Sequence, residues 1–157
     1  MNWRAVIGFE ICWLALAYWQ QTVLIPVLMY WLYGMSQLNN KSRLAVLNVI
    51  GAGLLIDSAL VTAGVIGFSD NIWLPLWFIL LWAVFALAAV EVMAAMLTKP
   101  WLAALLGGIG GPVSYIAGAG LSGGILQFYY GQWSYLILSI VWALIAIALG
   151  CSRRWYA

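Results

Sequence analysis

The chain has 157 residues, of which 67% are hydrophobic and only 6% are charged, and its formal net charge is +2. A soluble domain carries about 25% charged residues, so this composition excludes a soluble protein and predicts an all-α integral membrane protein. Histidine is absent and no basic cluster occurs, which excludes histidine-ligated metal sites and argues against nucleic acid as a partner. Nothing in the sequence predicts a metal or another cofactor.

Apolar runs separated by short polar breaks predict membrane-spanning helices, because about 20 helical residues cross the hydrocarbon core of a bilayer. In chain order the runs cover residues 3–19, 23–38, 44–68, 72–97, 101–121 and 133–150. We therefore predict one integral membrane domain over residues 1–157, a polytopic transmembrane helical bundle of six segments. The first two segments are short, so a re-entrant hairpin or one long broken helix is an alternative for them.

The basic residues favour six segments over five. With six crossings all of them fall on one side of the membrane, whereas fusing the first two runs would place Arg4 opposite Lys41 and Arg43. Lys and Arg collect in the cytoplasmic loops of membrane proteins. We therefore predict that both termini are cytoplasmic and that the remaining basic residues lie on the same side: Lys99, Arg153 and Arg154.

Three acidic residues lie inside the apolar runs, namely Glu10, Asp57 and Glu91. An ionisable group inside a bilayer is costly and suggests a functional site. No Lys or Arg lies at a comparable depth, so we expect no ion pair for any of the three. Each is either a neutral hydrogen-bond donor that holds helices together or a group that carries a proton or binds a ligand.

The third run carries a small and polar stripe. At helical spacing one face is formed by Asn48, Gly51, Leu55, Ser58 and Thr62, with Asp57 on an adjacent face. Small residues let helices approach closely, and polar ones form hydrogen bonds across the contact. We expect this stripe to face neighbouring helices and include Ser58 among the candidate ligand-binding residues.

The fifth run is rich in glycine and contains one proline. Pro112 lacks a backbone donor for the carbonyl of Gly108, four residues earlier. We therefore predict a kink or break at Gly110, Gly111 and Pro112. Ser114 and Tyr115 follow directly, and we expect them to share a polar cavity with Asp57.

Four ordered blocks of the chain resemble a known family. They are Ile56-Asp57-Ser58, Pro75-Leu76-Trp77, Leu81-Trp82 with Phe85-Ala86, and the eight residues from Gly111 to Gly118. The pattern is similar to that of the domain of unknown function 2878, a family of small polytopic proteins of the bacterial inner membrane. The resemblance implies that location and a link to lipid or light-stress physiology, but no reaction. Where it leads us to expect His-Ser, this chain has Glu91-Val92, which favours a proton or hydrogen-bond role over metal ligation.

Three classes of function remain open from the sequence. The preferred one is a membrane protein that binds or transports a small amphipathic or lipid-like ligand in a polar intramembrane pocket. The second is an enzyme that acts on a lipid or isoprenoid with a carboxylate acid or base, although no catalytic residue is assigned. The third is an assembly subunit. The expected partners are the bilayer, a lipid-like small molecule and a second copy of the chain, held by the pairs Gly107–Gly111 and Gly120–Gly124.

Overall fold

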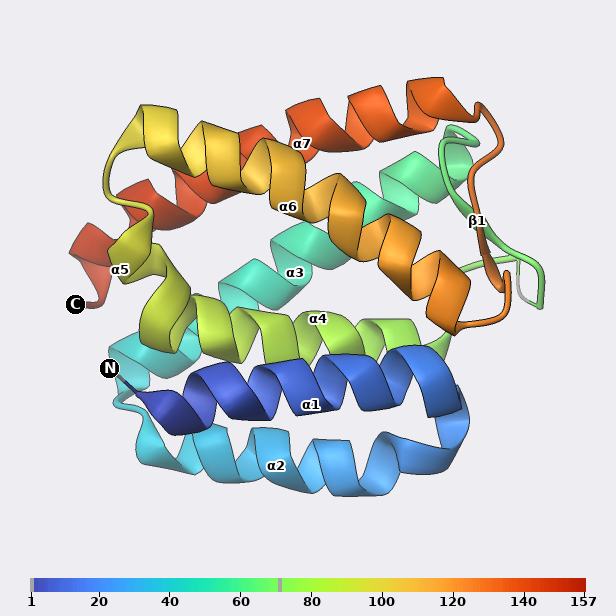
Figure 1. Ribbon diagram of the computed structural model, residues 1–157. Helices are drawn as coiled ribbons and strands as arrows, with labels where there is room; N and C mark the ends of the chain where they lie inside the picture. The colour runs from blue at the N-terminus through green and yellow to red at the C-terminus, as the bar shows by residue number, and fades with distance from the viewer. Residues whose placement is uncertain (1, 71) are drawn as a thin grey trace.

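The computed structural model describes residues 2–70 and 72–157. These residues form an all-α protein with one short two-stranded ribbon (Figure 1). The elements in order are α1 (Trp3–Trp19), the 3₁₀-helix η1 (Gln20–Val23), α2 (Leu24–Gln37), α3 (Asn40–Thr62), β1 (Gly67–Phe68), α4 (Leu76–Ala88), the π-helix η2 (Ala89–Met93), α5 (Ala94–Met96), α6 (Pro100–Leu121), β2 (Leu126–Gln127), α7 (Gln132–Ser152) and the 3₁₀-helix η3 (Arg153–Trp155).

Within the described parts of the chain, five helical stretches are long and apolar enough to cross a membrane. The first of them, Trp3–Gln37, contains both α1 and α2, which run antiparallel in Figure 1 because the chain reverses at Gln20, whose φ is +45°. Tyr30 of α2 accordingly reaches the opposite end of α1 and donates a hydrogen bond to the Arg4 carbonyl (3.2 Å). The first two predicted segments therefore form a helical hairpin, and the alternative of one long broken helix is wrong.

The connections between helices gather at two ends of the molecule. Both termini and the α2–α3 and α5–α6 connections lie at one end, and η1 and the β1–β2 ribbon lie at the other (Figure 1). The basic residues lie near the helix ends at the end of the molecule that carries both termini: Arg4, Lys41, Arg43, Lys99, Arg153 and Arg154. We call this the basic end.

The core is built around α4. It packs against α1, α2 and α3, and most of its residues are buried: Trp77, Phe78, Trp82, Ala83, Val84, Ala86, Leu87 and Ala88. Its sequence is apolar on every side, as expected for a helix that is surrounded by other helices. The side chains of α4 therefore form the surface against which α1, α2 and α3 pack inside the bundle.

The third predicted segment, 44–68, extends too far at its C-terminal end. The helix α3 ends at Thr62, because Gly64 has a φ of +72° and the N–H of Val65 donates back to the carbonyl of Leu60 (2.9 Å). This Schellman arrangement terminates helices at a glycine. The chain beyond it is extended and pairs as β1 with β2, which ties the α3–α4 connection to the α6–α7 connection.

The orientation predicted for the stripe on α3 is also wrong. The stripe is mostly exposed, since Gly53 and Asp57 face α4 and lie on the side of α3 opposite the stripe, not on the adjacent face that was predicted. Four stripe residues are exposed and Ser58 is half-buried; the exposed ones are Asn48, Gly51, Leu55 and Thr62.

Of the kink or break predicted at Gly110, Gly111 and Pro112, the break is wrong, because α6 is continuous there. The helix continues through Pro112 from Pro100 to Leu121. Pro112 does leave the Gly108 carbonyl without its helical donor, but the hydroxyl of Ser139 in α7 donates to that carbonyl. The neighbouring helix thus replaces the missing hydrogen bond.

Two glycines bring α6 and α7 close enough for this contact. A Cβ atom at Gly107 would meet the main chain of Trp142 and the side chain of Ala146, and one at Gly111 would meet the Trp142 ring. Small residues are used in this way where helices pack in membranes. The pair Gly107–Gly111 is therefore already covered by α7 of the same chain.

Replacing Ser139 by alanine should reveal its link to Pro112. Ser139→Ala removes the donor to Gly108, and we expect it to lower the free energy of unfolding by about 1 kcal/mol. In a Pro112→Ala background residue 112 regains its N–H, so the same substitution should cost much less. Unfolding of the four variants in detergent, followed by tryptophan fluorescence, measures this coupling. Equal costs in both backgrounds would contradict the assignment.

Candidate functional site

Asp57 joins three helices inside the bundle. Its side chain is buried, with 1% of the residue exposed. Trp82 of α4 donates its indole N–H to Oδ2 of Asp57 (2.6 Å). The hydroxyl of Tyr115 in α6 lies 2.8 Å from Oδ1 and 2.7 Å from Oδ2. Buried polar groups are costly unless they are hydrogen-bonded, so this network fixes α3, α4 and α6 relative to one another.

Aromatic rings surround this network. Trp82 stacks on Trp142 of α7, with centroids 5.5 Å apart and planes 9° from parallel. Phe85 meets the edges of both indoles, at 5.3 Å and 5.2 Å, and Phe78 packs edge-on against Tyr115 at 6.1 Å. These five residues, which we call the aromatic cluster, connect the Asp57 network to α7. Each such pair contributes about 0.5–1.5 kcal/mol beyond its buried area.

A cavity of about 320 Å³ lies beside the aromatic cluster. Its walls come from α1, α4, α6 and α7 and include all five cluster residues. At the basic end the wall is completed by Met93, Met96 and Leu97. Among the described residues that line the cavity, none is charged, and hydroxyl groups come only from Ser114 and Tyr115. The cavity is therefore apolar and aromatic, unlike the polar pocket predicted from the sequence.

The predicted site residues separate into two groups. Ser114 and Tyr115 line the cavity, and Tyr115 contacts Asp57 directly. Asp57 itself lies behind Tyr115 and Trp82 and does not line the cavity, and the Ser114 hydroxyl donates within its own helix to the Gly111 carbonyl (2.8 Å).

The other candidates lie elsewhere. Ser58 is half-buried on α3 and does not line the cavity, and Glu10 is exposed on α1. Gly110 and Gly111 line the cavity, although no helix break occurs there. Within residues 2–70 and 72–157, no three His, Cys, Asp or Glu side chains come close enough together to hold a metal ion.

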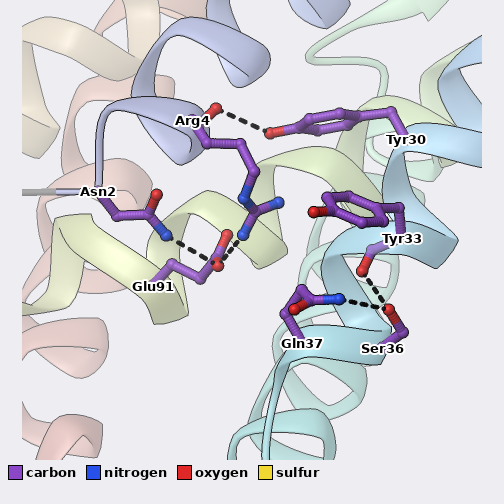
Figure 2. A network of polar contacts seen from close by, with 7 residues as sticks. All are labelled: Asn2, Arg4, Tyr30, Tyr33, Ser36, Gln37 and Glu91. Carbon is purple, nitrogen blue, oxygen red and sulfur yellow. Dashed lines mark hydrogen bonds and ion pairs between the residues drawn. The ribbon is translucent and has the colours of Figure 1, made fainter.

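Glu91 has an ion-pair partner, which corrects the expectation that none of the acids would. Figure 2 shows that Arg4 and Asn2, at the start of α1, both donate to the same oxygen of Glu91, Asn2 at 3.1 Å. The Arg4 guanidinium also lies over the ring of Tyr33, 5.7 Å from its centroid. Arg4 was expected at the membrane edge, but its long side chain reaches from the start of α1 to Glu91.

In the ion pair between Arg4 and Glu91, each side chain has one buried polar atom without a hydrogen bond. Nη1 of Arg4 and Oε2 of Glu91 are buried without a hydrogen-bond partner among the described residues. Glu91 also lies in the π-helix η2, and π-helical turns occur frequently at functional sites. Met93 of η2 and Met96 of the following α5 both line the cavity, so the ion pair holds this wall against α1.

Sequence reasoning missed Trp82 and Trp142. Tryptophan in membrane proteins is enriched at the interfaces, where it acts as an anchor. Both residues instead lie well inside α4 and α7, too deep for that role. One feature of the sequence could have indicated a buried indole–carboxyl contact. Trp82 lies in the middle of one apolar run, and Asp57 is a lone carboxyl group in another.

Comparison with known proteins places the chain in a family. Residues 2–148 match a family described as protein of unknown function (DUF2878). The chain belongs to this family. The match confirms the resemblance seen in the four sequence blocks. No curated protein and no solved structure matches the chain.

Asp57 should tolerate an amide but not an apolar side chain. In Asp57→Asn the amide oxygen can accept from Trp82 and the amide nitrogen can donate to the Tyr115 oxygen, so the loss should stay below about 1 kcal/mol. Asp57→Leu leaves two buried donors without an acceptor and should cost about 2–5 kcal/mol. Denaturant unfolding in detergent measures both values, and equal losses would argue against the network.

The partners in the ion pair should respond unequally. The Glu91 side chain is 6% exposed and that of Arg4 is 28% exposed. Arg4→Met leaves a buried acid without its counter-charge, with only the Asn2 amide as a donor, and should cost about 2 kcal/mol or more. Glu91→Leu leaves an arginine that can reach water and should cost about 1 kcal/mol. The double variant should be more stable than Arg4→Met alone. Additive losses in thermal unfolding would contradict a direct pair.

Proposed function

We propose that the protein binds a small amphipathic or lipid-like molecule in the cavity between α1, α4, α6 and α7, and carries it within or across the membrane. The observation that carries this proposal is the cavity of about 320 Å³ with uncharged walls of aromatic and aliphatic side chains. Ligand sites are typically concave and mostly apolar, with a few placed polar groups. A tightly packed assembly subunit would have no need for such a space.

The side chains that line the cavity indicate which kind of ligand would fit it. Aromatic rings and two methionine side chains contact an apolar chain or ring system well, because methionine adapts to irregular shapes. No charged group faces the cavity among the described residues. The ligand part held there is therefore uncharged, and any small polar group on it meets Ser114 or Tyr115.

The acidic residues do not support the enzymatic alternative. A general acid or base must come within hydrogen-bond reach of the reacting atom. Asp57 is separated from the cavity by its own partners Trp82 and Tyr115, and Glu91 is bonded to Arg4 on the side of α1. Binding without chemistry is the function that fits this arrangement best.

The proposal includes an orientation in a bacterial inner membrane. If α1 and α2 each cross the bilayer, the chain crosses six times and the basic end faces the cytoplasm, in line with the distribution of Lys and Arg in membrane proteins. The 17 residues of α1 span about 26 Å, close to the thickness of the hydrocarbon core. Tagging each terminus and testing its accessibility in sealed inner-membrane vesicles distinguishes this orientation from its inverse.

A cavity-filling substitution tests the binding function. Gly118 lines the cavity, and a Cβ atom placed on it meets nothing within 4 Å. Gly118→Leu should therefore fill the space without disturbing the fold. Gly120 offers a matched control, since it has the same free space on the same helix but is exposed and outside the cavity.

The readout is quenching of tryptophan fluorescence by a brominated fatty acid, together with native mass spectrometry of co-purified lipid. We expect the wild type and Gly120→Leu to retain lipid and to be quenched through the cavity tryptophans, and Gly118→Leu to lose about tenfold or more in affinity. Equal quenching of the three proteins, with the same retained molecules, would refute binding in this cavity.

A further inference from the structure

The face of α1 that borders the cavity is covered at one end and uncovered at the other. Ala17 lies seven residues after Glu10, which is almost two full turns, so the two residues share nearly the same face of the helix. Ala17 is fully buried and lines the cavity, whereas Glu10 is exposed. The protein therefore stops covering this face of α1 towards the basic end.

The facing side of α6 shows the same gradient. Four residues at intervals of four line the cavity, namely Gly118, Ser114, Gly110 and Leu106. Gly118 is buried and Ser114 is half-buried, whereas Gly110 and Leu106 are exposed. In Figure 1, α6 approaches α1 at the end away from the termini and lies further from it towards the basic end. The two helices therefore diverge, and we call the space between their exposed stretches the lateral opening.

Glu10 lies at the edge of the lateral opening without a counter-charge. It precedes Trp13, which lines the cavity, by three residues, so the two side chains are neighbours on α1. Arg4, the only basic residue of α1, is bonded to Glu91, and α6 contains no charged residue. None of the described residues forms an ion pair with Glu10. An acid inside a bilayer is costly, so a ligand that brings a positive charge would be stabilised there.

The two edges of the lateral opening lie at a similar depth. Both α1 and α6 begin at the basic end (Figure 1). Glu10 lies seven residues after Trp3, about 10 Å along α1, and Leu106 lies six residues after Pro100, about 9 Å along α6. If these helices cross the bilayer, a charge bound at Glu10 is partly removed from water, where salt screens an ion pair less.

A ligand seated in the cavity can place its head at this edge. The cavity walls are uncharged, so they suit an apolar tail and leave a charged head outside. An amine head would meet the carboxyl group of Glu10 and the ring of Trp13, and the faces of aromatic rings attract ammonium groups. We propose that the ligand is a cationic amphipath, an apolar chain with one amine head, which enters through the lateral opening and is held at its head by Glu10. This inference rests on the proposed function, because the cavity must bind the tail.

Two brominated probes with the same chain and opposite heads test this assignment. A brominated alkylamine and the corresponding brominated fatty acid are added to the protein in a detergent with uncharged head groups, and quenching of tryptophan fluorescence gives the Kd of each. We expect the wild type to bind the amine about tenfold more tightly than the fatty acid. Glu10→Gln should remove this preference, and Glu10→Lys should reverse it, because the fatty acid then meets the opposite charge.

Asp70→Asn is the matched control. It also removes one negative charge from an exposed residue, but at the β1–β2 end of the molecule, so it should keep the wild-type preference. Equal binding of both probes by the wild type, an unchanged preference in Glu10→Gln, or a lost preference in Asp70→Asn would overturn the amine assignment and leave the cavity as a binding site. Failure of both probes to bind any of the proteins would refute the proposed function as well. Thermal unfolding verifies that the variants fold.

Discussion

A carboxyl group inside an apolar bundle must find hydrogen-bond partners within the protein, and the arrangement of the helices depends on this requirement. Asp57 meets it with the indole of Trp82 and the hydroxyl of Tyr115, which come from two other helices. Once these two side chains are fixed, Trp142 and Phe85 pack onto the Trp82 ring. The same rings form part of the cavity wall, so a buried acid that does not itself line the cavity helps to determine its shape.

The same requirement explains how α6 remains helical through its proline. The carbonyl that Pro112 leaves free is bonded by Ser139 of the next helix, at a place where two glycines allow the backbones to meet. Among the described residues, Nη1 of Arg4 and Oε2 of Glu91 lack partners beside the π-helix, and so do the indole nitrogens of Trp31 and Trp142 and the hydroxyl of Tyr156. Both oxygens of Asp57 are therefore bonded, whereas the indole nitrogen of the neighbouring Trp142 and one atom of each partner in the Arg4–Glu91 pair are not.

Composition and run lengths were sufficient to predict an α-helical membrane protein and to place most helices within a few residues, because apolar length is a local property of the sequence. Asp57 and Tyr115 stood out for a similar reason, as polar groups in apolar runs. The contacts of these residues are not local. The Arg4–Glu91 pair depends on the reach of one arginine, the continuity of α6 depends on Ser139, and the exposure of the α3 stripe depends on which face α4 covers. None of these follows from the spacing of residues in one run.

The π-helix between α4 and α5 also sets the rotational phase of the chain that follows it. A π turn closes its hydrogen bond over one more residue than an α turn, and one residue corresponds to about 100° of rotation around a helix axis. Without the additional residue in Ala89–Met93, the side chains of Met96 and Leu97 would point about a quarter turn away from their present direction. One extra residue in the helical repeat thus determines which side chains line the cavity at its basic end, and a one-residue deletion there would change that lining while leaving composition and hydropathy almost unchanged.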